Sequence, residues 1–137
     1  MRSHEAFSTT ADSGFRFRGR GYAELYASAL RGLNALLFGR GGRPAAGGGG
    51  SLRYRFRGDG PENVLVNFLS EALFQAGIRG CRVGARVRRA GRDFLEADLL
   101  FGRRGSVPRV EVKAVTYHGL RVSRKNGVLS AAVVVDV

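Results

Sequence analysis

The segment Ser130-Ala131-Ala132-Val133-Val134-Val135-Asp136-Val137 is the part of the sequence that decides the fold. Its apolar run lacks polar alternation, which is typical of a strand covered on both faces, so we expect it in the centre of a sheet. The dipeptide Asn126-Gly127 lies shortly before it and favours a tight hairpin turn. The sequence therefore predicts a hairpin whose strands lie at 120–122 and 128–135.

A carboxylate follows this apolar run directly. Asp136 should adjoin the core, where an unpaired carboxylate is costly and requires a cation or several hydrogen bonds. Asp12 lies far upstream, in a turn of small residues before another predicted strand, and the α-carboxylate of Val137 follows Asp136. Calcium-like ions prefer several oxygen ligands at once. We therefore expect a hard-cation site formed by Asp12, Asp136 and Val137, and we expect the function to lie where the two ends of the chain meet.

Hydrophobic periodicity predicts the remaining elements. Apolar residues at three- and four-residue steps predict a helix over 22–38 that stops at Gly39, and a second helix that starts near Asp59 and Pro61 and ends at Gly77. Alternating residues, or apolar runs between turn signals, predict strands at 15–18, 52–57, 82–88, 94–101 and 110–115.

These elements predict the fold class. We expect an α+β domain with two helices packed on one side of a mainly antiparallel sheet, because the strands follow one another through short turns. At 137 residues the chain is expected to be a single domain over 1–137. A glycine-rich loop at about 39–51 interrupts it, since this composition cannot bury enough surface to order itself.

The net charge of +12 is the second notable property of the chain. Such a charge favours polyanionic partners, RNA or DNA first. Only two of the 23 basic residues are lysines, Lys113 and Lys125, and glycine is abundant, so a GC-rich coding bias explains the composition equally well. Outward strand positions carry arginines that form one basic surface if these strands are neighbours, although such positions are also typical of a solvated face: Arg16, Arg18, Arg53, Arg55, Arg57, Arg82, Arg86 and Arg88.

Several classes of protein are disfavoured by the sequence. No apolar stretch approaches the length of a membrane span and the N-terminus lacks a signal-peptide core, so we expect a cytoplasmic protein with no membrane partner. The single cysteine, Cys81, excludes an internal disulfide, and no Cys/His pair has zinc-ligand spacing. The sequence lacks a Walker-type phosphate loop and a credibly spaced Ser-His-Asp set, so we expect neither an enzyme nor a small-molecule substrate.

Four segments resemble the signature motifs of the archease family, in the family's order. Lys113-Ala114-Val115-Thr116-Tyr117-His118 is similar to the family's hexapeptide, and Thr10-Ala11-Asp12-Ser13-Gly14 resembles its His-Thr-Ala-Asp-x-Gly motif. The helix segment 65–74 resembles Leu-Val-Asp-Trp-Leu-Asn-Glu-Leu-Leu-Tyr, and 133–137 matches a terminal strand that ends in Asp plus one apolar residue. The resemblance covers most of the chain, whereas the glycine-rich loop and residues 79–108 add little to it.

The resemblance implies a non-enzymatic cofactor of the GTP-dependent tRNA-splicing RNA ligase. Such a protein promotes guanylylation of the ligase's active-site histidine and repeated turnover, with the ligase as partner and tRNA as a further one. The family also implies a divalent metal, calcium in the first place, near both chain ends. Carried over, its ligands are Asp12, Asp136 and a main-chain or terminal oxygen of Val137. The alternative function is a general RNA-binding or chaperone-like module that acts through the arginine-rich face.

Other positions of the motifs are expected to support the site or a partner: Asn67, Lys113, Tyr117 and His118. His118 has two interpretations, contact with the metal site or the ligase, and a structural role in holding its turn. Lys113 similarly contacts a phosphate or only solvates its face. The chain departs from the family pattern at Thr9, where the family has His, at Asn67, where it has Asp, and at Phe68, where it has Trp.

Overall fold

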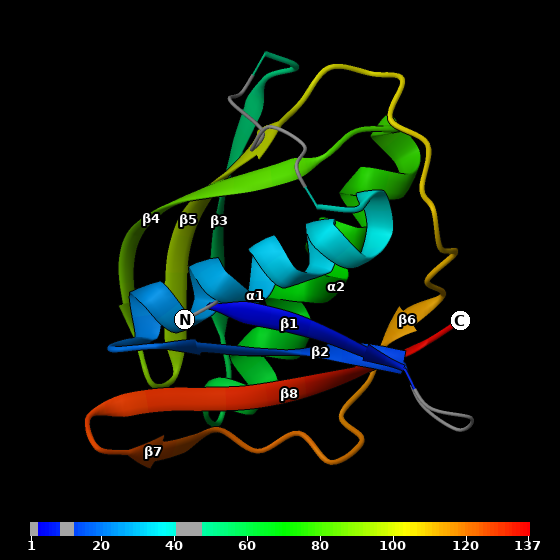
Figure 1. Ribbon diagram of the computed structural model, residues 1–137. Coiled ribbons are helices and arrows are strands. Elements are labelled where there is room, and N and C mark those ends of the chain that lie inside the picture. The colour runs from blue at the N-terminus through cyan, green and yellow to red at the C-terminus, as the bar shows by residue number, and fades with distance from the viewer. Residues whose placement is uncertain (1–2, 9–12, 41–47) are drawn as a thin grey trace.

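The structure is a computed structural model that describes residues 3–8, 13–40 and 48–137. These residues form two helices and two antiparallel sheets (Figure 1). The helices are α1 (Tyr22–Phe38) and α2 (Pro61–Arg79). The strands are β1 (His4–Ser8), β2 (Ser13–Gly19), β3 (Ser51–Arg57), β4 (Val83–Gly91), β5 (Phe94–Phe101), β6 (Ala114–Val115), β7 (Ser123–Lys125) and β8 (Val128–Asp136).

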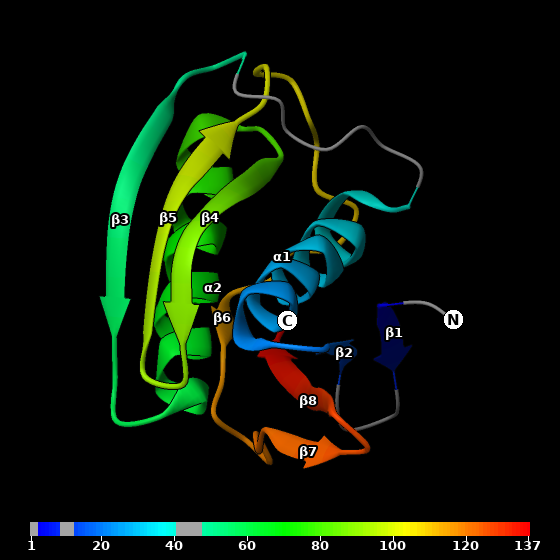
Figure 2. The same cartoon turned by 90° about the vertical axis from the view of Figure 1, so that its left-hand side faces the viewer.

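The predicted α+β fold class is confirmed, but the strands form two sheets instead of the single sheet expected. One sheet has the order β1-β2-β8-β6, with β7 also paired to β8, and the other has the order β3-β5-β4. Helix α1 lies between them, against β2 on one side and β4 on the other, while α2 packs on the three-stranded sheet and also contacts β6 (Figure 2).

The burial pattern of α1 explains why a second sheet is needed. The predicted apolar face includes Leu25, Ala29 and Leu33, but Ser28 and Leu30 are buried as well. Buried positions therefore extend around more of the helix than the single stripe of a helix that packs on one side. A helix with so broad a buried surface requires a partner on two sides, which the two sheets supply.

The terminal strand β8 has the central position that the sequence predicts. It pairs with β2 on one side and with β6 and β7 on the other, and Leu129, Val133 and Val135 are buried. The turn before it has positive φ at Asn126 (52°) and Gly127 (76°), as a two-residue type I′ hairpin requires. Because this turn joins Lys125 directly to Val128, the partner strand is β7, and the strand predicted at 120–122 is wrong by three residues.

Helix α2 extends further than predicted. Its N-cap is Gly60 and not Asp59, and it passes through Gly77 to Arg79. A glycine inside a helix costs only about 1 kcal/mol relative to alanine, so packing along α2 overrides it. The helix ends at Gly80, whose φ of 60° and ψ of 47° are the left-handed cap conformation that favours glycine.

Two further differences concern the predicted strands. Strand β1 was not predicted, and β6 contains only the last residues of the strand expected at 110–115. Much of the predicted glycine-rich loop, at 41–47, lies outside the described residues. In the described part of the chain, neither helix has the length and apolar character to cross a membrane.

Two hydrogen-bonding side chains of α1 hold the ends of β4. The Asn34 amide donates to the Val83 carbonyl oxygen at 2.6 Å, and its oxygen accepts from the Val83 N–H at 3.1 Å. At the other end, the buried Tyr26 hydroxyl donates to the Gly91 carbonyl oxygen at 2.7 Å. Burial raises the pKa of Tyr26 far above its usual range, so this hydroxyl remains a donor. Helix α1 therefore covers the edge strand β4 and forms hydrogen bonds to backbone groups at both of its ends.

On its other side, α1 approaches β2 closely at one glycine. A Cβ at Gly32 would lie 2.5 Å from the Cδ2 atom of Phe15, whose side chain is fully buried. Gly77 in α2 is exposed and has nothing within 4 Å of its Cβ position. The two helical glycines therefore offer a matched pair of substitutions.

We predict that Gly32→Ala lowers the free energy of unfolding by about 1–3 kcal/mol because it overpacks the α1–β2 contact. Gly77→Ala should raise it by up to about 1 kcal/mol through helix propensity. Urea denaturation of both variants and the wild type measures the two effects. A stabilising Gly32→Ala substitution would contradict the close packing of α1 on β2.

Candidate functional site

Strand pairing places the predicted site segments around the end of β8 (Figure 1). Ser13, the first residue of β2, pairs with Val135, and Ala114 of β6 pairs with Asp136. The Lys113 N–H also donates to the Asp136 carbonyl oxygen at 2.7 Å. The end of β8 is therefore flanked by the start of β2 and by the Lys113–His118 segment.

The expectation that Asp136 adjoins the core is wrong for its side chain. Val133 and Val135 are buried, whereas Asp136 and Val137 are exposed. The strand's two-residue periodicity has already turned Asp136 away from the buried face, and the sheet does not cover this last position. Its carboxylate consequently needs no buried partner, and it is accessible to a ligand from solvent.

The metal site itself stays a prediction. Asp12 lies outside the described residues, as does Thr9. Within residues 3–8, 13–40 and 48–137, no group of three or more His, Cys, Asp and Glu side chains could hold a metal ion. Of the three predicted ligands, the structure therefore describes only Asp136 and Val137, both at the exposed end of β8.

The turn after β6 is held by a threonine. The Thr116 N–H and hydroxyl both donate to the Val134 carbonyl oxygen, at 3.0 and 2.9 Å. The same hydroxyl accepts from the His118 N–H at 3.3 Å, and the Leu120 N–H donates to the Tyr117 carbonyl oxygen at 3.0 Å. The imidazole of His118 is exposed, so the structural role expected of it belongs to Thr116, which sequence reasoning missed.

Two residues at the start of α2 also form hydrogen bonds to the segment that follows β6. The Asn63 amide donates to the Tyr117 hydroxyl at 2.6 Å, and the Glu62 carboxylate accepts from the Val122 N–H at 2.7 Å. Tyr117 remains half exposed despite this bond. Neither Glu62 nor Asn63 was singled out from the sequence, because no local spacing connects them to residues about 60 positions away.

An apolar groove of about 670 Å³ runs between α2 and the segment before β6. Its walls include Leu73, Phe74 and Ile78 on one side and Val110, Val112 and Lys113 on the other. Phe74 and Ile78 are 58% and 57% exposed, although both are large apolar side chains. Asn67 is exposed. It lies one helical turn before Ser70 and two turns before Phe74, and both of these residues line the groove. Asn67 therefore lies on the same face of α2 as the groove.

The predicted arginines do not form one surface. Arg16 and Arg18 lie on β2, in the five-stranded sheet, whereas Arg53, Arg55, Arg57, Arg86 and Arg88 lie on β3 and β4, in the other sheet. Arg82 is turned inward, donates to the Phe38 and Gly39 carbonyl oxygens at 3.2 and 3.0 Å, and lies over the Phe38 ring. The prediction of an outward side chain is therefore wrong for Arg82, and for the other arginines strand order decides which of them are neighbours.

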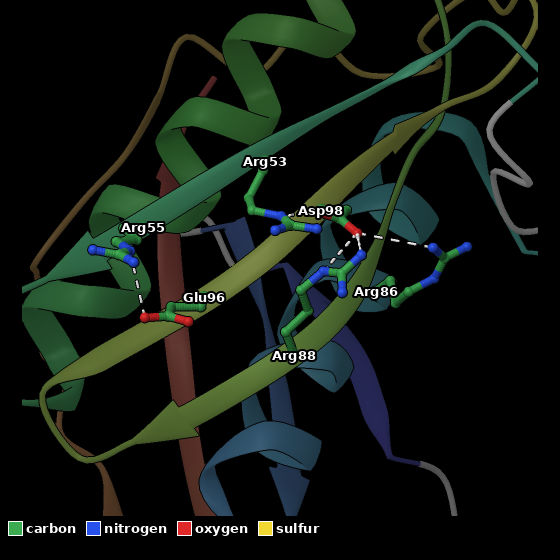
Figure 3. Close-up of polar contacts among 6 residues, drawn as sticks. All are labelled: Arg53, Arg55, Arg86, Arg88, Glu96 and Asp98. Atoms are coloured by element: carbon green, nitrogen blue, oxygen red, sulfur yellow. Dashed lines mark hydrogen bonds and ion pairs between the residues drawn. The ribbon is translucent and has the colours of Figure 1, made fainter.

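One buried carboxylate organises the arginines of the three-stranded sheet (Figure 3). Asp98 of β5 accepts from Arg88 at 2.8 and 2.9 Å and from Arg53 at 3.0 Å, with Arg86 3.8 Å away. Hydrogen bonds from Arg88 and then Arg53 hold the pKa of Asp98 below its usual range. Asp98 therefore stays charged well into the acid range.

The fold and the site geometry define a small α+β protein whose motif segments meet at one end of a central strand. A model of the archease protein family (MTH1598/TM1083) matches residues 4–137. The chain belongs to the archease family.

Two solved structures share the fold. The solution structure of Methanobacterium thermoautotrophicum protein 1598 has a TM-score of 0.76 and 23% identity, covering 100% of both chains. The crystal structure of a Thermotoga maritima archease, described as a possible chaperone, has a TM-score of 0.61 and 20% identity, covering 97% of this chain and 96% of that one. No match is found among curated proteins.

We predict that stability falls in acid partly through Asp98. A carboxyl with a lowered pKa in the folded state stabilises the fold above its ordinary pKa of 3.8, and this stabilisation is lost as the pH falls through the lower folded value. Asp98→Asn should therefore lower stability at neutral pH and flatten the loss below about pH 4. Urea denaturation across this range measures both effects. Asp59→Asn is the control, because it removes the same charge at an exposed position. Parallel pH profiles for wild type and Asp98→Asn would contradict the assignment.

Proposed function

We propose that this protein is a non-enzymatic activator of the GTP-dependent tRNA-splicing RNA ligase in the cytoplasm. It promotes guanylylation of the ligase and repeated turnover during tRNA splicing and RNA repair. The observation that carries the proposal is the convergence of the motif segments on the end of β8, through the Ser13–Val135 and Ala114–Asp136 pairs. Membership of the archease family supports it.

A divalent cation, calcium in the first place, is proposed to bind Asp12, Asp136 and Val137. The donor chemistry fits, because Asp136 is exposed and makes no ion pair within the described residues. Hard cations prefer such oxygen ligands. When bound, the ion neutralises the carboxylates and fixes the ends of β2 and β8 as one rigid surface.

The residues of the chain supply the rest of the proposed docking surface. Thr116, Asn63 and Glu62 hold the backbone of the Tyr117–His118 turn and the Tyr117 phenol in place beside β8. The exposed His118 imidazole extends from this fixed backbone. The Lys113 N–H donates to the carbonyl oxygen of Asp136, and Lys113 also lines the apolar groove. The groove is therefore continuous with the Tyr117–His118 turn. The ligase would contact a charged rim and an apolar centre, the arrangement typical of protein interfaces.

Asp136→Ala should abolish the stimulation of multiple-turnover tRNA ligation by the cognate ligase, because it removes a proposed metal ligand. The measurement is turnover with and without this protein, and Asp59→Ala controls for loss of an exposed carboxylate elsewhere. Failure of well-folded wild type to stimulate would overturn the proposed function.

The same site yields a direct binding test. A C-terminal extension after Val137 should weaken calcium binding nearly as much as Asp136→Ala, since both alter proposed ligands. Equal calcium affinity in extended and unextended protein, measured by titration calorimetry, would exclude the terminal carboxylate of Val137 as a ligand and leave only its main-chain oxygen.

The groove predicts a separate effect on docking. Phe74→Ser should weaken stimulation about tenfold or more, because exposed aromatic anchors dominate protein interfaces. Its thermal stability should change little, since Phe74 is more than half exposed. Leu52→Ser, at an exposed apolar residue of β3, is the matched control and should stimulate normally. Equal loss in both variants would exclude the groove as the docking surface.

A further inference from the structure

On the outer face of the three-stranded sheet, five arginines lie within ion-pair distance of two carboxylates. Figure 3 shows four of these arginines beside Glu96 and Asp98. Arg53 and Arg55 project from β3, and Glu96 and Asp98 from the central β5. Arg86, Arg88 and Arg89 come from β4. Besides the bonds to Asp98, Arg55 lies 3.4 Å and Arg89 3.8 Å from Glu96.

The carboxylates of this face are more deeply buried than its arginines. The side chains of Asp98 and Glu96 are only 9% and 20% exposed, whereas those of the five arginines are 42–70% exposed. The carboxylates therefore form a lower layer that fixes the guanidinium groups, and the arginines form the layer that a partner meets. With five cations over two anions, this layer keeps an excess positive charge of three.

A β-bulge increases the number of outward arginines. The pairing of β4 with β5 shifts between Val87 and Arg89, so that Arg86 opposes Asp98 and Arg89 opposes Glu96, with Arg88 as the extra residue. Without this shift, strict alternation would direct Arg89 toward the helices. The bulge instead allows Arg88 to reach Asp98 while Arg89 remains on the outer face, as bulges commonly re-aim side chains.

The face offers neither a stacking platform nor an apolar centre. Its one aromatic side chain, Phe94, has the Arg89 guanidinium 5.4 Å from its ring centroid. Of the exposed large hydrophobic residues in the described part of the chain, only Leu52 lies on this sheet, and it alternates with Arg53 onto the other side. The face therefore has no row of aromatic side chains on which successive bases could stack, and a protein partner would find none of the large exposed apolar anchors typical of interface centres.

We propose that the outer face of β3-β5-β4 binds the phosphate backbone of base-paired nucleic acid without reading its sequence. Arginine is suited to this role, because its planar fork binds phosphate oxygens bidentately and remains charged at any physiological pH. The surface is separate from the end of β8, so this inference goes beyond the proposed ligase function and does not depend on it. Each guanidinium that meets a phosphate releases counterions, which makes binding steeply salt-dependent.

The test compares two triple variants with the same change in charge. Arg55→Gln, Arg86→Gln and Arg89→Gln together remove the three most exposed guanidinium groups and spare Arg53 and Arg88, which bind Asp98 at close range. The control combines Arg16→Gln, Arg18→Gln and Arg121→Gln, whose arginines line a hollow on the other sheet.

The probes are a tRNA transcript, duplex RNA, duplex DNA, an unstructured RNA and, as an acidic polypeptide, poly-glutamate. Each is titrated between about 50 and 200 mM salt. We expect the first triple variant to bind tRNA about tenfold or more weakly at low salt. The slope of the logarithm of the binding constant against the logarithm of the salt concentration should become shallower by about two to three. The control variant should retain near wild-type affinity and slope. Circular dichroism and urea denaturation verify that both variants are folded.

The outcomes separate the alternatives. Binding of both duplexes supports a backbone site, and binding of duplex RNA alone supports the same site with a preference for A-form geometry. Equal losses in the two variants would overturn the proposal, because net charge and not this face would then drive binding. Preference for the unstructured RNA, or equal binding of poly-glutamate, would also overturn it, in favour of a base-stacking or an acidic-protein partner.

Discussion

The hydrogen bonds between Asn34 and Val83 are the constraint on which the arrangement of the two sheets depends. An amide side chain of α1 satisfies both backbone groups of one β4 residue, and the Tyr26 hydroxyl satisfies the carbonyl of Gly91 at the strand's other end. On its opposite side, α1 has β2 in contact at Gly32. The helix thus fixes the three-stranded sheet relative to the sheet that contains β8.

This arrangement separates two surfaces of different chemistry. The end of β8 gathers the start of β2, the Lys113–His118 segment and the first turn of α2, with an apolar groove beside them. The outer face of β3-β5-β4 has arginines and no apolar centre. The two proposals together assign a protein partner to the first surface and a nucleic acid to the second, on opposite parts of one small domain.

Local chemistry explains which parts of this were predictable. The bounds of α1 and the Asn126-Gly127 turn follow from periodicity and backbone preference, which act over a few residues. Gly77 was misinterpreted as a helix stop because packing outweighed its small propensity cost. The motif segments of the candidate site could be located from the sequence, but not Glu62 and Asn63, whose bonds span about 60 positions. The division into two sheets likewise depends on long-range strand pairing that no local pattern specifies.

The bulge at Arg88 also makes the arginine face dependent on chain length. Removing Val87 would convert the bulge into regular pairing: Arg88 would then oppose Ala97 and point toward the buried side of the sheet, so that Asp98 would lose its closest partner, while Arg89 would still oppose Glu96. Substitutions at these exposed positions should be tolerated in many combinations, while insertions and deletions should not. Among relatives of this protein, a gap in β4 would therefore mark loss of the surface more reliably than the exchange of any one arginine.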